Sequence, residues 1–169
     1  FNIGLNEAPT AIDLSNDTII ITQEQPEKVI GTFTTPDLDD DIHNYELENN
    51  AGGRFQVLDN ELQIANSTLL TANNQVSHTI TVKSTDQGGK LISQDFTLKL
   101  NYAPTDITLS NTIVSERSGE GIIGALSTSD PNLPNDSHIY SLADNPKGLF
   151  KLEDNQLLVS NTNLLEKGD

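Results

Sequence analysis

Among the side chains that could do chemistry in this 169-residue chain, carboxylates dominate. The sequence has 25 Asp and Glu against 9 Lys and Arg, a formal net charge of −16, and no Cys. Such a surface disfavours nucleic acids and anionic membranes, because both require Lys and Arg to neutralise phosphate. It suits hard cations such as calcium, which bind carboxylate and carbonyl oxygens. The simpler alternative is a solvated acidic surface. Because the chain has no Cys, disulfides and thiolate metal sites are excluded.

Other motifs with chemical potential lack the context that their chemistry needs. Residues 119–124 (GEGIIG) have the letters of a dinucleotide-binding turn, but residues 125–130 read as strand and loop, not as the helix that would meet phosphate. His43, His78 and His138 are scattered, without the clustered partners of a zinc site. No nucleophile elbow is evident. Paired carboxylates for glycoside hydrolysis stay open, yet the Asp residues lie in repeated loops, where structural copies are expected. We therefore expect no enzyme.

An internal repeat organises the chain. Residues 1–10 (FNIGLNEAPT) return as residues 96–105 (FTLKLNYAPT), and residues 55–64 (FQVLDNELQI) return as residues 150–159 (FKLEDNQLLV), each 95 positions later. Two shorter matches lie between them: VIG at 29–31 with IIG at 122–124, and YEL at 45–47 with YSL at 140–142. A shared order of matches indicates a repeat architecture, in which each copy is one structural unit.

Apolar residues alternate within each repeat with a period of two, which predicts β-strands. Phe96, Leu98 and Leu100, for example, alternate with polar residues. Residues 55–58 and 61–64 flank an Asp-Asn turn and predict a hairpin. No amphipathic helix of ten or more residues is evident. Roughly seven short strands per repeat, separated by Gly, Pro, Asn and Asp turns, predict an all-β, Ig-like β-sandwich.

The repeat also predicts the unit boundaries. Residues 1–6 are expected to be the last strand of a preceding unit, residues 7–101 a complete unit, and residues 102–169 a second unit. The Phe at position 1 indicates an excerpt of a longer protein. No apolar stretch approaches the ~18 residues that a membrane-spanning helix needs.

The second unit is expected to be truncated. The counterparts of residues 77–82 and 96–100, its last two strands, would follow residue 169. A sandwich without these strands exposes strand edges and core. We therefore expect this unit to be unstable or to be completed by another chain, with residues 1–5 of a neighbouring molecule as the natural strand donor.

Short motifs recur in a fixed order along the whole chain. They are Asn-x-Ala-Pro-Thr at the start of each unit, Val-x-Glu before a Gly at 114–116, an Asp-x-Asp or Asp-x-Asn loop, Tyr-x-Leu, and TDQG at 85–88. In these motifs the chain resembles bacterial cadherin-like repeats. The resemblance implies Greek-key β-sandwiches in tandem, with calcium at the junctions between them. Calcium at such junctions stiffens the array and supports adhesion.

The resemblance implies calcium ligands, carried over residue by residue from the linker, the Asp-x-Asp loop, the early strand and the late Asp-x-Gly. The implied metal ligands are Asn6, Asp37, Asp39 and Asp86 in the first unit, and Asn101, Glu116, Asp130 and Asn132 in the second. Carboxylates with an amide or backbone oxygen can begin a shell of six to eight oxygens. The alternative is that these residues make turns and cap loops.

Several positions depart from the family pattern. The early-strand Glu is Gln23 in the first unit, and the Leu-Asp-x-Glu motif appears as residues 70–73 (LTAN) and 165–168 (LEKG). The acidic linker has shrunk to Asn101 and Tyr102. We therefore expect at most one calcium per junction, bound more weakly than in the family.

The functional expectation is a non-enzymatic, calcium-associated structural or adhesion module of a large bacterial protein, secreted or at the cell surface. Its expected partners are neighbouring repeats of the same chain and, in homophilic adhesion, other copies of it. The alternative is a carbohydrate-binding module that accompanies a polysaccharide-active or surface protein. Sugar recognition favours exposed aromatic rings, and Tyr102, the one aromatic residue in the linker, is the residue to test.

Overall fold

The computed structural model describes residues 5–21, 28–38, 42–71, 75–114 and 121–160, and it divides the chain after Ala103 into two compact units. The regular secondary structure of the described residues is almost entirely β, as predicted, and their helices are the short α1 (Ser67–Thr71) and η1 (Pro146–Gly148). None of the described helices has the length and apolarity to cross a membrane. The predicted boundary, between residues 101 and 102, lies two positions before the observed division.

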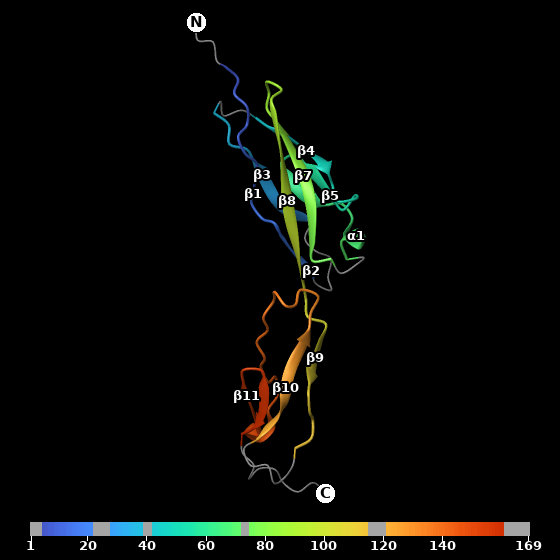
Figure 1. Cartoon of the computed structure of the whole chain (residues 1–169), viewed down its shortest axis with the longest axis vertical. Helices are drawn as coiled ribbons and strands as arrows, with labels where there is room; N and C mark the ends of the chain where they lie inside the picture. Colours follow the sequence, from blue (N-terminus) through green and yellow to red (C-terminus); the bar gives the residue numbers. More distant parts are fainter. Residues whose placement is uncertain (1–4, 22–27, 39–41, 72–74, 115–120, 161–169) are drawn as a thin grey trace. The chain divides into compact units, whose positions relative to one another are not determined.

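The first unit consists of two four-stranded sheets. Its strands are β1 (Asp13–Leu14), β2 (Thr18–Ile21), β3 (Val29–Thr34), β4 (Asn44–Asn49), β5 (Phe55–Leu58), β6 (Glu61–Ile64), β7 (Ser77–Thr85) and β8 (Leu91–Tyr102). One sheet has the order β1-β3-β6-β5 and the other β2-β8-β7-β4. Figure 1 shows the long strands β7 and β8 of the second of these sheets side by side. With β2 taken as a continuation of the first strand, this is the strand order of Ig-type Greek-key sandwiches. The predicted fold class is confirmed.

The first strand changes sheet at Asn16. Before it, β1 pairs antiparallel with β3, and after it, β2 pairs parallel with β8. The Asn16 side chain holds the crossing: its Nδ2 donates to the carbonyls of Thr18 and Ile30, both at 2.9 Å, and its Oδ1 accepts from the Thr18 N–H at 3.2 Å. A Cβ on Gly31 would lie 3.0 Å from the main-chain N and O of Asn16, so a side chain there would force the tightly packed crossing to shift.

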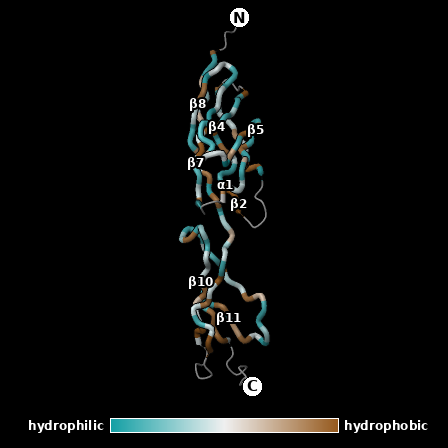
Figure 2. The backbone as a smooth tube through the Cα atoms, turned by 90° about the vertical axis from the view of Figure 1, so that its right-hand side faces the viewer, coloured by the Kyte–Doolittle hydropathy of each residue, from teal (hydrophilic) through white to brown (hydrophobic). Residues whose placement is uncertain are grey.

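The core of the first unit lies between the two sheets. Along β7, His78, Ile80, Val82 and Ser84 are buried, while the residues between them are more exposed. Figure 2 shows hydrophobic and hydrophilic stretches interspersed along the chain of the first unit. Because strand side chains point alternately to opposite faces, the predicted period of two appears directly in burial. Phe33 at the centre stacks on Tyr45, with ring centroids 5.5 Å apart.

The second unit repeats the hairpin of the first. Its strands are β9 (Asp106–Leu109), β10 (Ile122–Ser129), β11 (Phe150–Glu153) and β12 (Gln156–Val159), in the order β11-β12-β10-β9. The β5–β6 and β11–β12 hairpins have equivalent registers, and their turns place Asp59 and Asp154 at φ values of 56° and 53°. Asp tolerates this left-handed conformation better than most residues. The predicted hairpin and its repeat are confirmed.

The opposite sheet of the second unit is not present among its described residues. Residues 139–144 carry no strand, whereas the equivalent residues of the first unit include β4, which pairs with β7. Ile107 is consequently 61% exposed, although its counterpart Ile12 is 1% exposed in the core of the first unit. Completion of this unit by another chain stays a prediction, and residues 1–4 of the suggested donor segment lie outside the described residues.

Candidate functional site

The sequence-predicted ligands separate into several places. Asn6 and Asp86 meet at the loop between β7 and β8, and Asp37 lies beside His43. In the second unit, Asp130 and Asn132 share a loop, beside His138. Asn101 lies exposed on β8, and Asp39 and Glu116 fall outside the described residues.

Asp86 is a buried carboxylate whose two oxygens are both engaged. Its residue is 3% exposed, Oδ1 accepts the main-chain N–H of Lys90 at 2.8 Å, and Oδ2 accepts Nδ2–H of Asn6 at 3.0 Å. Burial alone would raise the pKa of Asp86, but hydrogen bonds from Lys90, Asn6 and the main chain of the loop glycines outweigh it and lower the pKa. Asp86 is therefore held ionised by protein donors.

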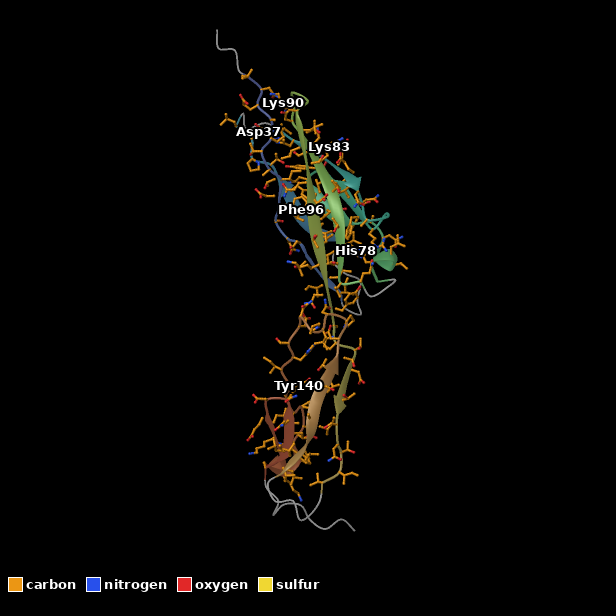
Figure 3. All side chains as sticks on the ribbon, in the orientation of Figure 1. Asp37, His78, Lys83, Lys90, Phe96 and Tyr140 are labelled. Atoms are coloured by element: carbon orange, nitrogen blue, oxygen red, sulfur yellow. The ribbon has the colours of Figure 1, made fainter. Side chains whose placement is uncertain are left out.

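Lys90 completes this cluster. Its ammonium Nζ donates to the main-chain carbonyl of Asn6 at 2.6 Å. Figure 3 shows Lys90 and Asp37 at the same end of the first unit, while His78 lies toward the other end. The sequence reasoning did not single out Lys90, because a lysine in a polar loop reads as a solvated side chain.

The loops with the Asp-x-Asp and Asp-x-Asn motifs each contain an Asp–His pair. Nε2 of His43 lies 3.2 Å from Oδ2 of Asp37, and Nε2 of His138 lies 3.2 Å from Oδ2 of Asp130. Both Asp side chains are 1% exposed, and the His side chains are 5% and 18% exposed. From the sequence, His43 and His138 were recognised in matching loops but interpreted as surface or packed imidazoles, without the Asp partners. The signal that could have found the pairs is that both partners recur together in matching loops.

Tyr102, the predicted linker aromatic, ends β8 within the first unit. Its ring is partly buried against the core, and its hydroxyl donates to the Gln75 carbonyl at 3.1 Å. Burial raises the pKa of this hydroxyl. The ring is therefore not a freely presented platform.

His78 is a buried imidazole of the core. It packs edge-on against Phe55, with ring centroids 6.0 Å apart, and its Nε2 has no hydrogen-bond partner among the described residues. Burial is the main cause that lowers its pKa, and the positive charge of Arg54 adds to the effect. His78 therefore favours its neutral form and serves packing.

The donors described do not fit calcium as they stand. No group of three or more His, Cys, Asp or Glu side chains in the described ranges is placed to hold a metal ion. Calcium takes six to eight oxygens at 2.3–2.6 Å, whereas Asp37 and Asp130 face imidazoles and Asp86 faces N–H groups. The predicted ligand set, with Asp39 and Glu116 not described, stays a prediction.

Comparison with known proteins returns cadherin ectodomains. Human protocadherin-24 EC1-2 (form II) is 16% identical with a TM-score of 0.46, and the match covers 91% of this chain and 78% of the protocadherin chain. Drosophila N-cadherin EC1-4 is 13% identical, covers 95% and 43%, and has a TM-score of 0.42. Mouse cadherin-23 EC22-24 is 16% identical, covers 88% and 53%, and has a TM-score of 0.41.

No family model matches the chain, and no curated protein matches it. The strand order of the first unit carries the fold assignment: it is the Ig-type β-sandwich that the sequence predicts.

Proposed function

We propose that this chain is a non-enzymatic structural or adhesive module of an extracellular repeat protein. The observation that carries the proposal is the recurrence of one Asp–His pair, with a buried carboxylate, in equivalent loops of both units, at the same 3.2 Å separation. A catalytic or ligand-binding constellation is expected once, with its groups open to the ligand. A pair that is copied, with its carboxylate buried against an imidazole of the same loop, instead holds that loop in place in each structural module.

The proposed setting follows from the cadherin-like motifs. The module would lie in a secreted or cell-surface protein, contact neighbouring repeats of its own chain, and in an adhesive role bind further copies of itself. Nucleic acid is not among the proposed partners because of the net charge of −16. Calcium association is a separate part of the proposal, and it depends on a shell that the described donors do not form.

The structural role of the Asp–His pairs is tested by Asp37→Asn and Asp130→Asn. Each change keeps the size of the side chain but removes its charge, so a charge-assisted hydrogen bond worth about 1.5–3 kcal/mol weakens. We expect each variant to destabilise its own unit without any added ligand, measured by hydrogen exchange of each unit. Unchanged protection in both variants would contradict a structural role for the pairs.

Calcium association is tested by thermal unfolding with excess calcium and with chelator, in the wild type and in Asp37→Ala. An ion that binds only the folded state stabilises it by about 2.7 kcal/mol at a hundredfold excess over its dissociation constant. A calcium-dependent rise that disappears in the variant would establish the site. Equal melts with calcium and chelator would leave a module whose junctions rely on packing. Aggregation of beads coated with the chain then separates adhesion from a spacer role.

The carbohydrate-binding alternative has less support, because Tyr102 packs against the core of its own unit. An open pocket of about 500 Å³ in the second unit does include an aromatic side chain; its lining consists of His138, Ile139, Tyr140, Leu152, Asp154 and Asn155. The Tyr140 hydroxyl, however, is engaged by Thr128 at 2.9 Å. Retention on polysaccharide gels that Tyr102→Ala abolishes would favour this alternative over the structural one.

A further inference from the structure

The segment that enters the first unit is held by the loop that joins β7 to β8. Asn6 lies 80 positions before Asp86, yet its side-chain amide donates to the Asp86 carboxylate. The loop is itself fixed, because Asp86 N–H donates to the Lys90 carbonyl at 2.9 Å and Lys90 N–H donates to Asp86 Oδ1 at 2.8 Å. Asn6 is thus bound to a preformed turn.

The hydrogen-bond chemistry shows how Asn6 is oriented. An ionised carboxylate only accepts, so the Asn6 amide presents its NH₂ group, not its oxygen, to Asp86. A calcium ligand would have to present the amide oxygen to the ion instead. The pairing of Asn6 with Asp86 therefore joins two predicted calcium ligands directly to each other.

Lys90 supplies a positive charge at the same place. Its ammonium group contacts the main-chain oxygen of Asn6 at 2.6 Å, at the short end of charge-assisted hydrogen bonds. For calcium to use this oxygen, the ammonium group would have to leave. A calcium ion beside the ammonium group would also be repelled by it.

Gly88 makes room for this arrangement. A Cβ built on Gly88 would overlap the side-chain amide of Asn6. The side chain of Asn6 is therefore seated directly on the backbone of the loop. Asn6, Asp86, Gly88 and Lys90 together form what we call the entry clamp.

We propose that Lys90 is the resident cation of the entry clamp, so that an ammonium group of the protein holds the incoming segment where the cadherin-like resemblance places calcium. Calcium stiffens a junction only when the ion is present. The entry clamp holds its segment at any calcium concentration, because its cation is a side chain of the loop between β7 and β8. The proposal is independent of whether the module acts as a spacer or in adhesion.

The test uses the full chain, labelled with ¹⁵N, in chelator and then with added calcium. We expect the backbone N–H of Asn6 to have an order parameter of about 0.85 in chelator, typical of rigid backbone. We also expect no change in it when calcium is added. A mobile Asn6 that calcium orders would overturn the proposal.

Lys90→Met keeps the length of the side chain but removes its charge, and we expect the Asn6 order parameter to fall below about 0.6. Lys99→Met is the matched control, since Lys99 is an exposed lysine on β8, outside the entry clamp, and pairs with Asp17. It should leave Asn6 unchanged. An Asn6 that stays ordered in Lys90→Met would refute the role of the ammonium group.

A second variant, Gly88→Ala, tests the clamp without altering charge. The added methyl group displaces the side-chain amide of Asn6, so we expect the same loss of order at the backbone N–H of Asn6. The strands should stay intact in Lys90→Met and in Gly88→Ala. An unchanged order parameter for the backbone N–H of Asn6 in Gly88→Ala would contradict the contact of the Asn6 side chain with the loop backbone.

Discussion

Ile12 and Ile107 occupy the same position of the repeat but opposite environments, which allows a matched test of the burial. Ile12 is 1% exposed in the core of the first unit, and Ile107 is 61% exposed on β9. We expect Ile12→Ala to destabilise the first unit strongly and Ile107→Ala to have a small effect on the second.

The magnitude follows from the groups removed. Ile→Ala deletes three carbon groups, worth about 0.8 kcal/mol each when buried, or about 2.4 kcal/mol in total. The cavity left in a packed core raises the loss to about 3–4 kcal/mol. At Ile107, where most of the side chain already contacts water, the loss should stay below about 1 kcal/mol.

Urea denaturation followed by circular dichroism gives the stability change. With a slope of about 2 kcal/mol per molar urea, Ile12→Ala should lower the midpoint of the first unit by about 1.5 M. Hydrogen exchange with mass spectrometry assigns each loss to its unit. Equal losses from the two variants would refute the reasoning, because they would mean that Ile107 is covered in solution.

Three further predictions concern other features of the first unit. Because the pKa of His78 is lowered in the folded state, the unfolded chain binds the proton more readily. Stability should therefore fall as the pH drops below about 6.5 and level off below the pKa of the folded state. In His78→Leu, the urea midpoints should no longer show this pH dependence. Asn16→Ala removes three hydrogen bonds at the strand crossing and should cost about 1–2 kcal/mol in urea denaturation, while a loss below about 0.3 kcal/mol would contradict its role. Gly31→Ala places a Cβ against the main chain of Asn16 and should cost about 1–3 kcal/mol, measured in the same way; an unchanged midpoint would show that the crossing is loosely packed.

The strands and the hairpins could be predicted because their causes are local. Alternating apolar residues specify which face of a strand is buried, and an Asp in the left-handed region specifies the β5–β6 turn. The change of sheet at Asn16 could not be predicted, because it depends on a hydrogen bond to Ile30, 14 positions away.

The candidate site shows what sequence reasoning can identify and what it cannot. It placed Asn6 and Asp86 in one predicted set of calcium ligands, which stays a prediction, and in the structure their side chains form a hydrogen bond. It could not predict that they bond to each other, because an amide can donate as well as accept, and residue type does not reveal which group it presents. Lys90 was missed for the related reason that only the folded loop brings its ammonium group to Asn6.

The parallel pairing of β2 with β8 has a mechanical consequence. The four residue pairs from Thr18↔Lys99 to Ile21↔Tyr102 join the opening strand of the first unit to its closing strand. When the chain is stretched from its two ends, these parallel strands are pulled in opposite directions along their length. The hydrogen bonds between them are then loaded in shear and must break together, not one after another as in an unzipping hairpin. The resistance of the first unit to force therefore resides in this short seam.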